Sequence, residues 1–201
     1  MPHKRSRPET EQRFIDAVIS LLGESGCAHL GINLVAQRTG TDKVLIYRYF
    51  GDLDGLLERV AKSRTWLPTA EELLRPLTAG PDRLISKLTQ DLIHHVKSDA
   101  ATLQLARWRH ALKNPLTDGY SNEWKVLWQE IPGILSEGLD YTERQKWAQA
   151  CSLLAAVTEA RLMDQPIDHA ALQTLSKELI SADLNQWHTD LEAERLPTNL
   201  L

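Results

Sequence analysis

Apolar residues recur every three to four positions along almost the whole chain, and this spacing restricts the possible folds more than any other feature of the sequence. Phe14, Val18, Leu21 and Leu22, for example, lie at i, i+4, i+7 and i+8, which places them on one face of a helix. No stretch of valine and isoleucine alternates with polar residues, and no Asn-Gly or Asp-Gly pair separates two alternating runs. The sequence therefore predicts an all-α protein of about nine helices.

Capping residues and breaks at glycine and proline divide this pattern into segments. Thr10 is expected to cap the first helix and Thr142 to open a capping box with Gln145. Residues 66–81 are rich in proline and are expected to form a hinge or linker. The expected helices cover residues 10–26, 31–38, 42–50, 52–66, 82–96, 99–113, 118–138 (bent or split at 132–133), 142–164 and a last helix from 168.

Composition and charge exclude several classes of protein. Residues 1–65 hold 10 Lys and Arg against 8 Asp and Glu, whereas the remaining residues hold 13 against 19, so only the N-terminal part suits a polyanionic partner. No apolar run reaches the length of a membrane span, and Cys27 and Cys151 fit free thiols in a reducing cytoplasm. We find no enzyme motif and expect neither a cofactor nor a metal, since Asp91, His94 and His95 lack further ligands nearby.

Residues 31–50 have the spacing of a helix-turn-helix: a short helix, a turn at Gly40 and a second short helix. If Ile46 and Phe50 face inward, the outer surface of the second helix carries side chains suited to DNA. Lys43 and Arg48 can bind phosphate or guanine, Tyr47 and Tyr49 can donate to phosphate, and Val44 and Leu45 can contact a thymine methyl. The candidate DNA-binding residues are Lys43, Val44, Leu45, Tyr47, Arg48 and Tyr49, with Arg5 and Arg7 in a basic N-terminal arm that is alternatively a solubilising tail.

Residues 10–60 resemble the DNA-binding domain of the TetR family of transcriptional regulators. The shared pattern is Leu21-Leu22, Gly26, Val35-Ala36, Gly40, Tyr47-Arg-Tyr-Phe50 and Leu56-Leu57, all in register without a gap. The sequence departs from the family pattern at three positions: Gly31 replaces a threonine, Val44 a glycine and Leu53 a lysine. The resemblance implies a homeodomain-like three-helix domain at residues 1–57 and a helical ligand-binding and dimerisation domain at residues 58–201.

The second domain offers candidates for an effector pocket and a dimer interface. The family's ligand-binding habit makes the tryptophan-rich middle helices a candidate pocket for a small apolar or aromatic effector, with simple packing as the alternative. The small residues of 142–164 and the leucines of the last helix suit a two-fold four-helix interface, with intramolecular packing as the alternative. The pocket candidates are Leu105, Trp108, Leu112, Trp124, Leu127 and Trp128, and the interface candidates are Ala148, Cys151, Ala155, Leu172, Leu175 and Leu179.

These observations predict a cytoplasmic, homodimeric transcriptional regulator that binds a pseudo-palindromic operator in double-stranded DNA. The resemblance further implies a repressor that a small molecule releases. The alternative is a helical protein-interaction module that keeps the fold but has weak or lost DNA binding. An enzyme is the third and least supported class.

Overall fold

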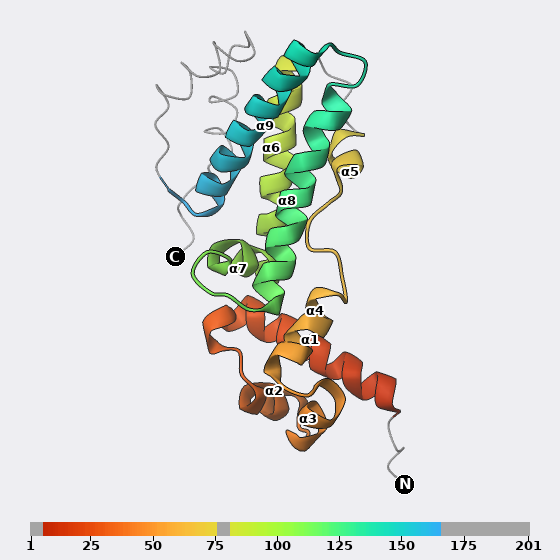
Figure 1. Ribbon diagram of the computed structural model, residues 1–201. Helices are drawn as coiled ribbons and strands as arrows, with labels where there is room; N and C mark the ends of the chain where they lie inside the picture. The colour runs from red at the N-terminus through yellow and green to blue at the C-terminus, as the bar shows by residue number, and fades with distance from the viewer. Residues whose placement is uncertain (1–5, 76–80, 166–201) are drawn as a thin grey trace. The chain divides into compact units, whose positions relative to one another are not determined.

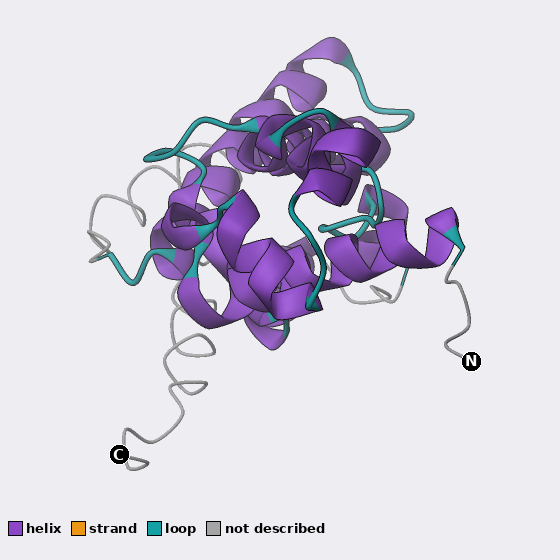
Figure 2. Ribbon diagram, turned by 90° about the horizontal axis from the view of Figure 1, so that it is seen from below, coloured by secondary structure: helices purple, strands orange, loops and turns teal. Residues whose placement is uncertain are grey.

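The computed structural model describes residues 6–75 and 81–165, and in this part of the chain every regular element is a helix (Figure 2). The all-α prediction is confirmed. Helix α5 was not expected, several helices begin or end at other residues than expected, and the helix expected from residue 168 lies outside the described residues. In chain order the elements are α1 (Arg7–Ser25), a 3-10 turn η1 (Cys27–His29), α2 (Ile32–Thr39), α3 (Val44–Phe50), α4 (Leu53–Ala61), α5 (Ala70–Leu74), α6 (Pro81–Ser98), α7 (Ala100–Trp108), α8 (Pro115–Leu135) and α9 (Tyr141–Leu162).

The chain forms two compact units. Unit 1 consists of residues 1–67 and 96–124, and unit 2 of residues 68–95 and 125–201. Two helices, α6 and α8, contribute residues to both units. The predicted boundary between a DNA-binding domain at residues 1–57 and a second domain at residues 58–201 does not coincide with the limits of these units, and it stays a prediction.

In unit 1, α1 contributes six buried apolar residues to the core, more than α2, α3 or α4, and these helices lie together (Figure 1). Phe14, Val18 and Leu22 are fully buried on α1, as the helical spacing predicts. The α1 helix packs against α2, α4 and α7, and α3 packs against α4. Buried Ile46 of α3 and Leu56 of α4 complete this core.

Two helices begin earlier than the sequence indicated. Ser6 caps α1, because its side chain accepts from the Glu9 N–H while the Glu9 carboxylate accepts from the Ser6 N–H. Thr10 is a buried residue inside this helix, so the expected cap at Thr10 was wrong. Asp140 caps α9 through the Glu143 N–H, which corrects the capping box expected at Thr142.

In unit 2, buried apolar residues come from α5, α6, α8 and α9. Leu88 and Leu92 of α6 and Ile131 of α8 are almost completely buried, as is Leu154 of α9. Pro132 lies inside α8, which continues to Leu135 rather than dividing at the proline. None of the helices in the described ranges has the length and apolar character that crossing a membrane would need.

Candidate nucleic-acid interface

The turn between α2 and α3 is fixed by glycine and by two residues of the turn itself. Gly40 adopts a left-handed conformation (φ 60°, ψ 34°), and its N–H and that of Thr41 return to carbonyl groups of α2. The Thr39 hydroxyl bonds to the Val35 carbonyl and to the Thr41 hydroxyl. The α2–turn–α3 angle is therefore set by hydrogen bonds as well as by packing.

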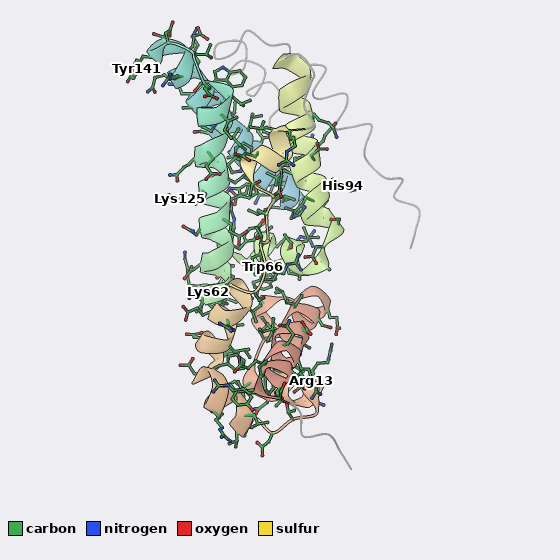
Figure 3. All side chains as sticks on the ribbon, turned by 90° about the vertical axis from the view of Figure 1, so that its right-hand side faces the viewer. Arg13, Lys62, Trp66, His94, Lys125 and Tyr141 are labelled. Atoms are coloured by element: carbon green, nitrogen blue, oxygen red, sulfur yellow. The ribbon has the colours of Figure 1, made fainter. Side chains whose placement is uncertain are left out.

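Arg13 of α1, which is half-buried, braces the same turn. Its guanidinium donates to the Thr39 carbonyl at the end of α2, a group that the helix itself leaves unpaired (Arg13 is labelled in Figure 3). No sequence pattern indicated this residue, because a lone arginine on a helix has no local partner that points to it.

A second brace joins α2 to α1 on the surface. Arg38 forms two hydrogen bonds with the Glu24 carboxylate, at 2.8 and 2.6 Å, and one with the Ser20 hydroxyl at 2.9 Å. The hydrogen bonds from Arg38 lower the pKa of Glu24 to about 2. Arg38 is thus committed to α1, which leaves other cations to meet DNA.

The helix α3 divides into a buried side and an exposed side. Ile46 is completely buried, and the half-buried Phe50 ring lies edge-on to Phe14 at a centroid distance of 6.0 Å. Val44 is 59% exposed and Tyr47 50% exposed. Ile46 therefore faces inward and Val44 and Tyr47 face outward, as expected, whereas Leu45, also expected on the outer surface, is half-buried.

The charged side chains on α3 and at its start are exposed to solvent and can contact a ligand. Lys43 and Arg48 are exposed, and neither forms an ion pair or hydrogen bond through its side chain within the described part of the chain. Asp42 holds the start of α3, because its carboxylate accepts from the Val44 N–H at 2.9 Å. An ordered helix start therefore presents two available cations beside Val44 and Tyr47.

Two other predicted DNA-binding residues pair with each other instead. The Arg7 guanidinium lies 5.0 Å from the centroid of the Tyr49 ring, and it also forms an ion pair with Glu11 at 2.6 Å. Tyr49 is half-buried and lies edge-on to Phe50. Leu45 is also half-buried, and Arg5 lies outside the described residues.

Two of the three residues that depart from the family pattern, Gly31 and Leu53, lie at helix starts. Gly31 is the N-cap of α2 in extended conformation (φ −163°, ψ 153°), and it supplies no capping side chain. Leu53 is the first, half-buried residue of α4, which Asp52 caps through the Gly55 N–H at 2.8 Å. The helix starts at these positions are therefore intact although the usual polar side chains are missing.

In unit 1, α7 also packs against α1 near two glycines, Gly23 within α1 and Gly26 at its C-cap. A Cβ at Gly23 would lie 3.3 Å from the Ala100 Cβ, and one at Gly26 would lie 3.0 Å from the Trp108 indole nitrogen. Both glycines were expected to end the first helix. Gly26 does end α1, whereas Gly23 lies inside it, where α7 approaches closely.

The segment after α4 is held to α8 by one carboxylate. Glu123 accepts from the backbone N–H groups of Trp66 (2.9 Å) and Leu67 (3.0 Å), and burial raises the pKa of this glutamate (Trp66 is labelled in Figure 3). Beside it, Arg64 pairs with Asp99 at 2.6 Å. The stretch expected to be a hinge is therefore firmly attached at its beginning.

Four of the six pocket candidates lie in unit 1 and two in unit 2. In unit 1, Leu105 and Trp124 are buried, and Leu112 and Trp108 are half-buried. The guanidinium of buried Arg109 lies over the Trp124 ring, 4.5 Å from the ring centroid. Leu127 and Trp128 belong to unit 2, where both are buried.

Three of the interface candidates lie within the described residues, all on α9. Cys151 is buried within the single chain, and burial raises the pKa of its thiol to about 12. Ala148 and Ala155 are partly exposed. Leu172, Leu175 and Leu179 lie outside the described residues.

Comparison with known proteins agrees with this geometry. The family model described as "Bacterial regulatory proteins, tetR family" matches residues 14–60. The HTH-type transcriptional regulator BetI of Klebsiella pneumoniae (strain 342) is 25% identical over 195 residues, covering 92% of this chain and 98% of the relative. The BetI protein of Escherichia coli (strain K12 / DH10B) is 24% identical over the same shares.

Solved structures show the same fold at lower identity. HlyIIR, a hemolysin II transcriptional regulator, superposes with a TM-score of 0.50 at 17% identity, covering 79% of this chain and 92% of that one. The regulator SCO7518 of Streptomyces coelicolor A3(2) gives a TM-score of 0.52 at 18% identity, covering 86% and 99%.

A braced helix-turn-helix that exposes cations and a tyrosine on and beside its second helix, in a chain whose described elements are all helical, is the architecture of a DNA-binding transcriptional regulator. Residues 14–60 match the DNA-binding domain of the TetR family, and the similarity to HTH-type regulators over 92% of the chain supports a TetR family transcriptional regulator.

Proposed function

We propose that this regulator binds a pseudo-palindromic operator as a homodimer, represses transcription, and is released by a small apolar or aromatic effector. The single observation that carries the operator-binding part is the exposed side of α3, with Val44 59% and Tyr47 50% exposed opposite fully buried Ile46. Solvent exposure of these groups on an ordered helix matches the docking of a recognition helix in a major groove.

Each residue at the start and on the exposed side of α3 has a role that follows from its chemistry. Lys43 and Arg48 neutralise phosphates or donate to guanine, and the Tyr47 hydroxyl donates to a phosphate oxygen. Arg7 contributes indirectly by holding the Tyr49 ring, while Arg5 belongs to the arm that precedes α1. This proposal assigns positioning to Tyr49 and Arg7 and readout to the exposed residues.

The homodimer part of the proposal involves α9 and the leucines 172, 175 and 179, which lie outside the described residues. Small residues such as Ala148 and Ala155 on α9 allow close approach of helices. Two copies related by a two-fold axis would place their recognition helices in half-sites about 34–36 Å apart or slightly more.

The effector part of the proposal centres on the tryptophans of α7 and α8. A ligand shifts the regulator only through its differential affinity for two arrangements. Trp108 is a suitable reporter of that difference, since the same indole lies against Gly26, the C-cap of α1, and donates to Gln104 at 3.2 Å. A ligand that displaces Trp108 would act directly on the helix that carries the core of the DNA-binding part.

An electrophoretic mobility shift with the purified protein tests the proposed function. The probe is the DNA upstream of the protein's own gene, with a scrambled duplex of equal length and composition as control. We expect binding of the upstream duplex at a concentration that leaves the scrambled duplex free, weakening steeply as salt rises. Equal binding to both duplexes, or none, would support the protein-interaction alternative.

Relatives named as transcriptional regulators agree with a non-enzymatic, cytoplasmic role.

A further inference from the structure

The most exposed large hydrophobic residue of α3 is a valine. Val44 is 59% exposed, and among the large hydrophobic residues of the described chain only Tyr141, at 76%, is more exposed. It lies two residues before buried Ile46, so at about 100° per residue its side chain projects about 160° away from the core. Tyr47 and Arg48 project to either side of it, which places Val44 at the centre of the exposed side.

The local structure holds this side chain in place. Asp42 fixes the start of α3 by accepting from the Val44 N–H at 2.9 Å. A β-branched valine in a helix strongly prefers one rotamer, so its two methyl groups point in a set direction. Val44 therefore presents a rigid apolar contact between hydrogen-bonding neighbours.

Only one group on the base edges of a major groove suits such a contact. Adenine, guanine and cytosine present hydrogen-bonding groups, whereas thymine also presents its C5 methyl. Lys43, beside Val44, supplies an available cation for the DNA backbone or guanine. The chemistry of this position thus matches thymine and disfavours a polar base edge.

We propose that Val44 determines operator specificity by contacting the C5 methyl of one thymine in each half-site. This inference rests on the proposed function and adds the base that α3 reads. Burying one methyl group corresponds to about fourfold in affinity per half-site and about 15-fold for two half-sites.

The experiment replaces thymine by deoxyuridine, which removes only the methyl group. The upstream DNA is amplified with dTTP or dUTP, and the binding of each product is measured for the wild-type protein. Short duplexes that carry deoxyuridine at single positions within the bound region then locate the effect. We expect about 15-fold weaker binding when both half-sites lack the critical methyl.

Two variants assign that loss to a side chain. Val44→Ala should bind the two DNA products with nearly equal affinity, because it no longer reaches the methyl. Val126→Ala removes the same groups from a valine that is 39% exposed on α8, and it should keep the full deoxyuridine penalty. Circular dichroism checks that both variants keep their helices.

The negative outcomes distinguish a failure of the Val44 inference from a failure of the proposed function. If wild type binds both products equally, or if Val44→Ala retains the penalty, the assignment of Val44 is overturned while DNA binding stands. If wild type binds neither product, the proposed function itself fails.

Discussion

Replacing Gly31 by threonine should both stabilise the protein and tighten its binding to DNA. Gly31 is the N-cap of α2, it supplies no capping side chain, and its extended backbone (φ −163°, ψ 153°) suits a β-branched residue. A Cβ at this position meets no atom within 4 Å. A threonine hydroxyl can therefore accept from the first turn of α2 without displacing a neighbour.

The magnitude combines two contributions. Threonine exceeds glycine as an N-cap by a few tenths of a kcal/mol, and removing a glycine lowers the entropy of the unfolded chain by about 0.4–1 kcal/mol. The free energy of unfolding should rise by about 0.5–1.5 kcal/mol, or about 2–4 °C in Tm per kcal/mol. The hydroxyl also lies where the first helix of the pair meets the DNA backbone, so one added hydrogen bond predicts about two- to tenfold tighter binding.

Urea unfolding followed by circular dichroism and fluorescence anisotropy with the upstream duplex measure the two effects. Gly31→Ala is the matched control, because it removes the glycine but adds no hydroxyl and is a poor N-cap. It should change both quantities little. The reasoning is refuted if Gly31→Thr is no more stable than Gly31→Ala, or if it gains stability without any gain in affinity.

Two further predictions concern the attachment of the segment after α4. Glu123→Ala leaves the N–H groups of Trp66 and Leu67 without their acceptor and should lower the free energy of unfolding by about 2–4 kcal/mol, whereas Glu123→Gln keeps an acceptor oxygen and should cost about 1 kcal/mol or less. Equal urea midpoints for the two variants would contradict this role. Burial opposes ionisation of Asp99, but the Thr102 hydrogen bond and the Arg64 charge lower its pKa overall. Its stabilisation is therefore present above the unfolded pKa and lost as pH falls through the folded one, so Asp99→Asn should be less stable than wild type at pH 7 and the gap should close below about pH 4. A gap that stays constant from pH 7 to strong acid would argue against the ion pair.

Local patterns in the sequence were sufficient to predict the arrangement of α2 and α3. The apolar spacing in this region identified Ile46 as inward and Val44 and Tyr47 as outward, and Gly40 marked the turn. These features depend on residues a few positions apart, where helix geometry determines which side chains share a face.

Contacts between distant residues could not be predicted in the same way. Glu123 reaches Trp66 across 57 positions, and Arg13 reaches Thr39 across 26, without any periodic pattern connecting them. Gly23 looked like a helix end because a glycine inside a helix is unfavourable, yet α7 approaches α1 at that point. The absence of a side chain at Gly23 is therefore explained by the close approach of α7 and not by the end of α1.

The most direct test of the central claim is the affinity of Lys43→Ala and Tyr47→Phe for the upstream duplex, measured by fluorescence anisotropy at several salt concentrations. Lys62→Ala and Tyr141→Phe serve as matched controls, since both are exposed residues outside α3. We expect each α3 variant to bind more weakly than its control while keeping its helical signal, and Lys43→Ala to reduce the salt slope by about one if it neutralises a phosphate. Wild-type affinity in both α3 variants would contradict the placement of this helix in the groove.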